Sequence, residues 1–179
     1  ASLRARAVKL LGPIPSTNPK LTRAKVIENY LPSLKMRGVR TRGEVIYSQR
    51  CASCHRGSTQ GFVFGPDLVT MKAHGAEKLL TNLIDPSREI AADFVAYEVR
   101  TGKETLLGLL ANETTSHLTI RFPFGKSVTL ERKEVRGMKS HSASIMPAGL
   151  EEGLDHQSMA DLLAFLVDPE QATSAKKEE

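Results

Sequence analysis

Cysteine, tryptophan and long apolar runs are scarce or absent in this sequence of 179 residues. It has two cysteines, Cys51 and Cys54, and no tryptophan. Two cysteines so close together cannot form the set of bridges that stabilises small disulfide-rich domains. With 40% hydrophobic residues, the chain can bury an ordinary apolar core instead. The two cysteines are therefore interpreted as a motif.

No run of about 18 apolar residues, the length that a membrane-spanning helix needs, is present. The basic and apolar regions that mark a signal peptide are also missing. We therefore expect no transmembrane segment. Because the sequence begins at Ala1 rather than at a methionine, we expect a processed protein or a fragment of a longer chain.

Acidic residues are scarce in the first 43 positions, where Glu28 is the one acid against ten Lys or Arg. The whole chain has a formal net charge of only +5. Such a basic segment can attract an acidic partner, although a solvated surface is the simpler interpretation. No nucleic-acid motif and no interleaved aromatic pattern accompany it, so we predict no binding to nucleic acid.

Apolar spacing predicts helices on both sides of a region with strand-like alternation. The expected helices cover 3–11, 22–37, 42–49, 75–84 and 155–167. Residues 94–140 are rich in β-branched side chains, and Gly102, Asn112 and Gly125 separate four alternating segments. The expected fold is mainly α, with a small antiparallel, barrel-like β insertion over 94–140.

The segment Cys51-Ala52-Ser53-Cys54-His55 fits the attachment signature of haem c, in which two thiols add to the vinyl groups and the imidazole binds iron. A redox dithiol also uses C-x-x-C, but it normally follows a strand, whereas a helix is expected before Cys51. A zinc site needs four ligands, and a second pair is missing. We expect one covalently bound haem c, with His55 as an iron ligand.

A six-coordinate haem needs a second axial ligand. The chain offers eight histidine or methionine candidates: Met71, His74, His117, Met138, His141, Met146, His156 and Met159. Met159 lies on the apolar face of the last expected helix, so core packing is its default role. His74, His117 and His156 lie among polar neighbours, as solvated histidines do. Met146 is favoured because Pro147 fixes the backbone of the irregular segment that carries it.

The chain resembles class I cytochromes c in the order of its motifs. These are Gly43 and Tyr47 on a helix, Cys51-x-x-Cys54-His55, Gly65-Pro66-Asp67-Leu68, Met146-Pro147 and the final helix around Phe165. The resemblance implies that Tyr47 meets Phe165 where two helices cross. It also implies that the Pro66 carbonyl accepts the ring N–H of His55. Leu68, Ile84 and Phe94 would then line the haem pocket.

Residues from about 94 to 140 depart from standard class I cytochromes. With the Asp85-to-Ile90 segment and Ser144-x-Met146-Pro147, the chain looks like the C-terminal haem-binding domain of planctomycete and verrucomicrobial dehydrogenase-like proteins. We expect a helical extension or linker over 1–38, a haem domain over 39–170 that contains the insertion at 94–140, and a flexible tail over 171–179.

Three functions fit these patterns. The first is transfer of single electrons, without enzyme activity, between redox proteins or to an attached dehydrogenase domain. The alternative is a haem c enzyme or gas sensor whose sixth ligand is labile. A third possibility adds a docking role for the β insertion, which could otherwise only shield the haem. Because haem c is attached outside the cytoplasm in bacteria, we expect a periplasmic protein.

Overall fold

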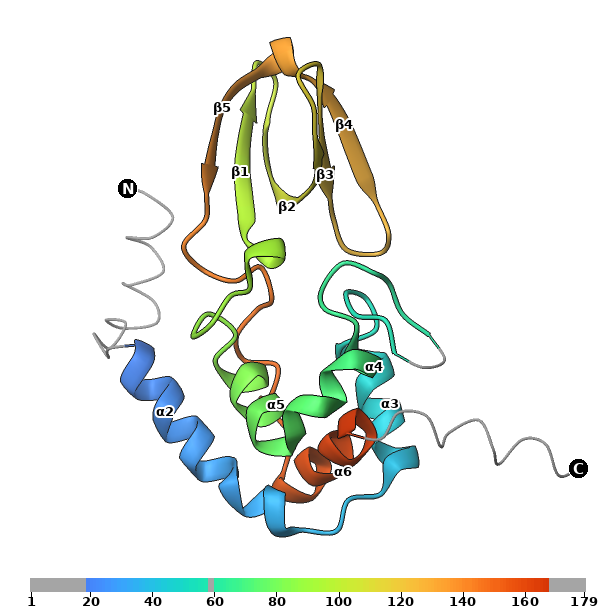
Figure 1. Cartoon of the computed structure of the whole chain (residues 1–179). Helices are drawn as coiled ribbons and strands as arrows, with labels where there is room; N and C mark the ends of the chain where they lie inside the picture. The colour runs from blue at the N-terminus through green and yellow to red at the C-terminus, as the bar shows by residue number, and fades with distance from the viewer. Residues whose placement is uncertain (1–18, 58–59, 168–179) are drawn as a thin grey trace, which may run out of the picture.

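The computed structural model describes residues 19–57 and 60–167, which form a group of helices below a β-sheet (Figure 1). The helices are α2 (Pro19–Tyr30), α3 (Arg40–Arg50), α4 (Leu68–Met71), α5 (Gly75–Ile84) and α6 (His156–Val167). The 3-10 turns are η1 (Leu31–Lys35), η2 (Lys72–His74), η3 (Ala92–Phe94) and η4 (Arg132–Glu134). The strands are β1 (Ala96–Thr101), β2 (Thr105–Glu113), β3 (His117–Arg121), β4 (Ser127–Glu131) and β5 (Val135–Ser140).

Helices α3 and α6 cross at the base of the molecule. The Tyr47 and Phe165 rings meet there, with their centroids 5.0 Å apart, which confirms the expected contact. Gly43 makes this approach possible, because a Cβ at that position would lie 2.0 Å from the carbonyl oxygen of Asp161. Asp161 in turn accepts hydrogen bonds from the backbone N–H of Val39 and from the Arg42 guanidinium. The start and the middle of α3 are thereby both attached to α6.

One apolar cluster fills the space among the helices. Its buried members are Tyr30, Tyr47, Cys51, Leu79, Leu80, Leu83, Ile84, Met159, Leu162, Leu163, Phe165 and Leu166. Helix α5 has the expected bounds, and its four buried side chains lie on one face, as an amphipathic helix requires. Met159 is completely buried in this cluster, so its expected role in the core is confirmed.

The five strands form one antiparallel sheet with the order β4-β3-β2-β1-β5. Val99 on β1 pairs with Leu106 on β2 and with Met138 on β5. The cluster around Val99, Leu118 and Ile120 also receives side chains from the two edge strands, β4 and β5. The sheet therefore curls around a core of its own. Among the described strands β4 and β5 share no ladder, so the curled sheet does not close into a barrel.

The sheet docks on the helical part through a small apolar cluster of Phe64, Ala96 and Leu109. The hairpin between β3 and β4 also reaches the cysteine motif, where the Phe124 N–H donates to the Ser53 carbonyl at 2.9 Å. Phe124 has a φ of 61°, a strained value for a residue with a side chain. The sheet is therefore in direct contact with the segment between the two cysteines.

The expectation of a mainly α chain is wrong, because a five-stranded antiparallel sheet makes up a large part of the structure. The four expected strands are present, but β5 was not predicted. Its sequence Val-Arg-Gly-Met-Lys-Ser contains a glycine and few strongly β-forming residues, and it is ordered by pairing with the distant β1. The expected helix over 3–11 and the tail over 171–179 lie outside the described residues.

Candidate functional site

The cysteine motif lies directly after α3. The Cys51 N–H donates to the Tyr47 carbonyl at 2.8 Å, and the His55 N–H donates to the Cys51 carbonyl at 2.9 Å. The helical path therefore continues for one more turn, which keeps both thiols and the imidazole close together. Cys51 is buried, Cys54 is half-buried, and both thiols are free. Their placement fits two attachment points for one group.

The two thiols belong to two different apolar clusters. Cys51 packs in the cluster among the helices, and its burial raises the thiol pKa to about 12. Cys54 packs against the cluster that joins the sheet to the helices, where Phe94 and Ile145 also lie. The segment between the thiols thus connects the two halves of the molecule.

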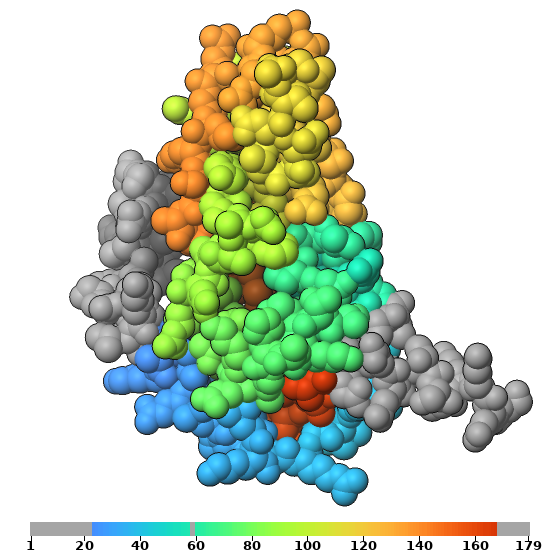
Figure 2. All heavy atoms as spheres, viewed as in Figure 1, coloured from blue at the N-terminus to red at the C-terminus, as the bar shows by residue number. Residues whose placement is uncertain are grey.

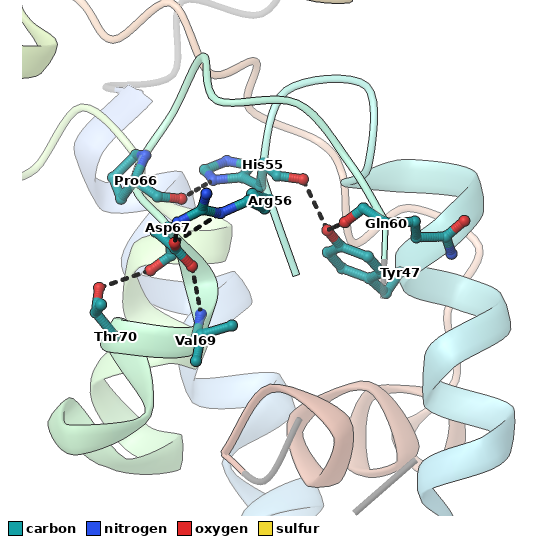
Figure 3. Close-up of polar contacts among 8 residues, drawn as sticks. All are labelled: Tyr47, His55, Arg56, Gln60, Pro66, Asp67, Val69 and Thr70. Atoms are coloured by element: carbon teal, nitrogen blue, oxygen red, sulfur yellow. Dashed lines mark hydrogen bonds and ion pairs between the residues drawn. The ribbon is translucent and has the colours of Figure 1, made fainter. Parts of the chain in front are cut away.

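His55 is held by its Nδ1 atom, which lies 2.8 Å from the Pro66 carbonyl oxygen (Figure 3). A carbonyl can only accept, so Nδ1 carries the proton and Nε2 keeps its lone pair. Burial lowers the pKa of His55, which favours the neutral imidazole that a metal requires. The expected hydrogen bond to Pro66 is confirmed, and it leaves Nε2 with a lone pair that a metal could accept.

The loop that carries Pro66 runs beside the cysteine motif. Four backbone N–H groups of this loop donate to carbonyl oxygens in or just after the motif. Phe62 donates to Ala52, Phe64 and Gly65 donate to Cys54, and Leu68 donates to Arg56. An ion pair between Arg56 and Asp67 adds a side-chain contact, and Asp67 also caps α4 by accepting from the Val69 N–H at 2.9 Å (Figure 3). Together these contacts fix the Pro66 carbonyl beside the ring of His55.

Gly65 and Tyr47 complete the surroundings of His55. A Cβ on Gly65 would lie 2.5 Å from the Cε1 atom of His55, so only glycine leaves room for the ring. The Tyr47 hydroxyl lies 2.7 Å from the His55 carbonyl oxygen and 3.1 Å from that of Gln60 (Figure 3). Burial raises the pKa of Tyr47 to about 12, so the hydroxyl stays protonated and donates. Sequence reasoning assigned no role to Gly65, although its place before a proline was visible.

Met146 lies in the segment between β5 and α6. It is half-buried and packs against the cluster among the helices, as do Leu68 and Met71. Ile84, a fully buried member of that cluster, comes from the end of α5. Figure 2 shows the surface hollowed above α5, with the segment that precedes α6 visible at the bottom. The three expected pocket residues are therefore divided: Leu68 and Ile84 belong to the cluster that also contains Met146, and Phe94 belongs to the other.

The other candidate ligands lie in different surroundings. His74 and His117 are exposed, whereas Met138 belongs to the separate core of the sheet. His156 is half-buried, with its ring 5.7 Å from that of Tyr30. His141 is half-buried too, and its Nδ1 lies 3.0 Å from the Ala143 carbonyl oxygen. Among the methionines of the candidate set, Met71, Met146 and Met159 pack in or against the cluster that contains Cys51.

The residues present fit a haem c group. Two free thiols, one imidazole with Nε2 prepared for metal, and an apolar cluster with a methionine form the donor set that this cofactor uses. Because Gly65 lies so close to the imidazole, the ring is held in one orientation. No helix in the described part of the chain is both long and apolar enough to cross a membrane.

Residues 41–108 match the family model of cytochrome c. The matched region begins in α3, contains the cysteine motif and α5, and ends within β2. The comparison with curated proteins gave no match. This part of the chain is therefore similar to cytochrome c, a family of haem c proteins that transfer electrons, and it contains the segment arranged around His55.

Proposed function

We propose that the chain is a monohaem cytochrome c that transfers single electrons, with His55 and Met146 as the axial ligands of its iron. The observation that carries the proposal is the hydrogen bond from His55 Nδ1 to the Pro66 carbonyl, because it leaves Nε2 available to a metal. Met146 is the partner of choice because it shares the cluster that contains Cys51 and Ile84.

Four residues would hold the cofactor. Cys51 and Cys54 would form thioether bonds to it, while His55 and Met146 would bind its iron. Bound haem c supplies an iron that changes between Fe(II) and Fe(III). A thioether ligand raises the reduction potential relative to a second histidine, and an apolar pocket lined by Leu68, Ile84 and Phe94 would act in the same direction by keeping water away.

The domain organisation belongs to the same proposal. We assign the haem domain to 39–170, its β insertion to 94–140, the N-terminal extension to 1–38 and the tail to 171–179. Haem c is attached outside the cytoplasm in bacteria, so we place the protein in the periplasm. Its electron partners would be redox proteins or an attached dehydrogenase-like domain, and its basic N-terminal segment would favour an acidic partner.

Intact mass and redox titration test this proposal. The protein produced in cells that attach haem c should gain the mass of one haem per chain, and that mass should persist after denaturation. A titration followed by absorption should show one reversible transition that involves a single electron. The variant Cys51→Ala/Cys54→Ala should lose the added mass.

Two results would contradict the proposal. Absence of covalently held haem in the unmodified chain would exclude a c-type cytochrome. A high-spin spectrum in both oxidation states, with rapid binding of peroxide or a diatomic gas, would favour the haem enzyme or sensor with a labile sixth ligand.

A further inference from the structure

Glu151 is a buried carboxylate in the segment that joins Met146 to α6. Only 3% of the residue is exposed, although acidic side chains are almost never buried unless they are paired. Its Oε1 atom accepts from the Nη1 atom of Arg23 at 2.6 Å. Its Oε2 atom has no hydrogen-bond partner in the described part of the chain. The Glu151 side chain is therefore held by Arg23 of helix α2.

Arg23 connects two segments that flank the proposed haem pocket. The Nη1 atom that pairs with Glu151 also lies 3.3 Å from the carbonyl oxygen of Ile84, the last residue of α5. That carbonyl belongs to the helix end, where backbone acceptors have no partner within the helix. One guanidinium thus joins the end of α5 to the segment that follows Met146.

Tyr30 adds a second connection from the same helix. It lies seven residues after Arg23, about two helical turns, and therefore on the same face of α2. Its hydroxyl lies 2.6 Å from the Leu154 carbonyl oxygen and 3.1 Å from that of Glu151. Arg50 of α3 holds the segment from another side, because its Nη1 lies 2.7 Å from the Leu150 carbonyl oxygen. The segment 150–154 is therefore held from α2 and from α3.

The chain between Met146 and Glu151 is short and conformationally restricted. Pro147 fixes its own φ, and Gly149 has a φ of 93°, which other residues rarely adopt. The Glu152 N–H donates to the Gly149 carbonyl at 3.0 Å and closes a turn. Only four residues separate Glu151 from Met146, so we expect a shift of Glu151 to change the position of Met146.

We propose that Arg23 and Tyr30 of α2 are positioning residues for Met146, and that they hold its segment in the position from which Met146 would bind the haem iron. The inference rests on the proposed function, because it requires Met146 to bind iron. It gives α2, which lies outside the region that matches the cytochrome c family model, a role in setting how readily the sixth position opens.

Competition by imidazole tests this inference on the ferric holoprotein. Imidazole binds iron only when Met146 has left, so its apparent Kd falls as the closed state loses stability. The variant Arg23→Gln should lower this Kd by about tenfold or more, because the buried Glu151 loses its charged partner. Arg132→Gln is the matched control, because it removes an exposed ion pair with Glu113 in the sheet and should leave the Kd unchanged.

Two further variants separate positioning from general damage. Tyr30→Phe keeps the ring and removes only the hydroxyl, so a smaller fall of the imidazole Kd, about threefold to tenfold, is expected with the fold retained. Arg23→Lys keeps the positive charge and should bring the Kd back toward that of the unmodified protein. If Arg23→Gln does not fold, the Tyr30→Phe result decides between the outcomes.

Failure of this inference differs from failure of the proposed function. If imidazole binds the unmodified protein as tightly as it binds Met146→Ala, Met146 is not a ligand and the proposed function fails. If Met146→Ala binds imidazole more tightly, but Arg23→Gln and Tyr30→Phe both match Arg132→Gln, the proposed ligation stands and the positioning role of α2 is overturned.

Discussion

The His55 side and the Met146 side of the candidate site are fixed in contrasting ways. Contacts that hold His55 join residues close in sequence: its ring bonds to Pro66 and its carbonyl to Tyr47, across 11 and 8 residues. The segment after Met146 is held by Arg23 and Arg50, across 128 and 100 residues. One side is therefore built from local motifs, and the other depends on the assembly of the whole chain.

Because of this contrast, we expect different substitutions to disturb the two sides. A change in the cysteine motif or in the following loop should disturb His55 first. A change in a distant helix should open the Met146 side first, because long-range contacts form only when the fold is complete. Both sides share the crossing of α3 and α6 as their base.

Gly43→Ala disrupts the crossing of α3 and α6 and should cause the largest loss of stability. The added Cβ would lie 2.0 Å from the Asp161 carbonyl oxygen and 2.9 Å from the Phe165 Cβ, so the helices must separate. We expect a loss of about 3 kcal/mol in the free energy of unfolding, measured with denaturant. Gly102→Ala is the control, since its nearest neighbour is the flexible Arg136 side chain at 3.4 Å. Equal stability of the two variants would contradict the close crossing.

Gly65→Ala changes the surroundings of His55 and leaves the Met146 segment unaltered. The added Cβ would lie 2.5 Å from the Cε1 atom of the His55 ring, which has to turn away from Pro66. We expect a loss of about 2 kcal/mol in stability and a haem spectrum with a weakened or high-spin iron. Unchanged spectra would show that the close contact between Gly65 and His55 does not orient the ring.

The pH dependence of stability tests how α3 is attached to α6. Burial opposes ionisation of Asp161, but hydrogen bonds from Arg42, Val39 and Gln157 outweigh it and hold its pKa below the usual value. The stabilisation is therefore complete above the unfolded pKa of about 4 and is lost as pH falls through the lower folded pKa. Asp161→Asn should cost about 1.5 kcal/mol at pH 7 and flatten the acid side of the stability curve. If the free energies of unfolding of the two proteins change in parallel below pH 4, the pKa of Asp161 is not lowered in the folded state.

Arg132→Gln should have the smallest effect. Its partner Glu113 is 39% exposed, and the pair lies in the sheet, far along the chain from either ligand. An exposed ion pair contributes between about 0 and 1 kcal/mol, so thermal unfolding should change by only a few degrees at most. A large loss of haem ligation in this variant would show that the sheet controls the site.

The local side of the site could be predicted from the sequence. The spacing of Cys51, Cys54 and His55 places them within about one helical turn, and the resemblance to class I cytochromes c implied the hydrogen bond from His55 to Pro66. The contact between Tyr47 and Phe165 was also expected, because the resemblance to class I cytochromes c implies it. The placement of Met146 at the iron stays a prediction.

The rest could not be predicted, because it depends on distant partners. Strand β5 has weak propensity and exists through pairing with β1, so a mainly α fold was expected wrongly. The charges of Arg23 and Glu151 gave no sign of their pairing, since nothing in either local sequence marks a buried ion pair. Gly65 was visible beside Pro66, but its role required the position of the His55 ring.

The far-red absorption band that arises from sulfur bound to ferric iron tests the central claim most directly. The oxidised protein should show this band, Met146→Ala should lose it, and Met71→Ala, which changes another half-buried methionine of the same cluster, should keep it. That result would show that Met146, whose segment is held by distant residues, is a ligand of the haem iron. A band that survives in Met146→Ala, or no band in the unmodified protein, would contradict the account.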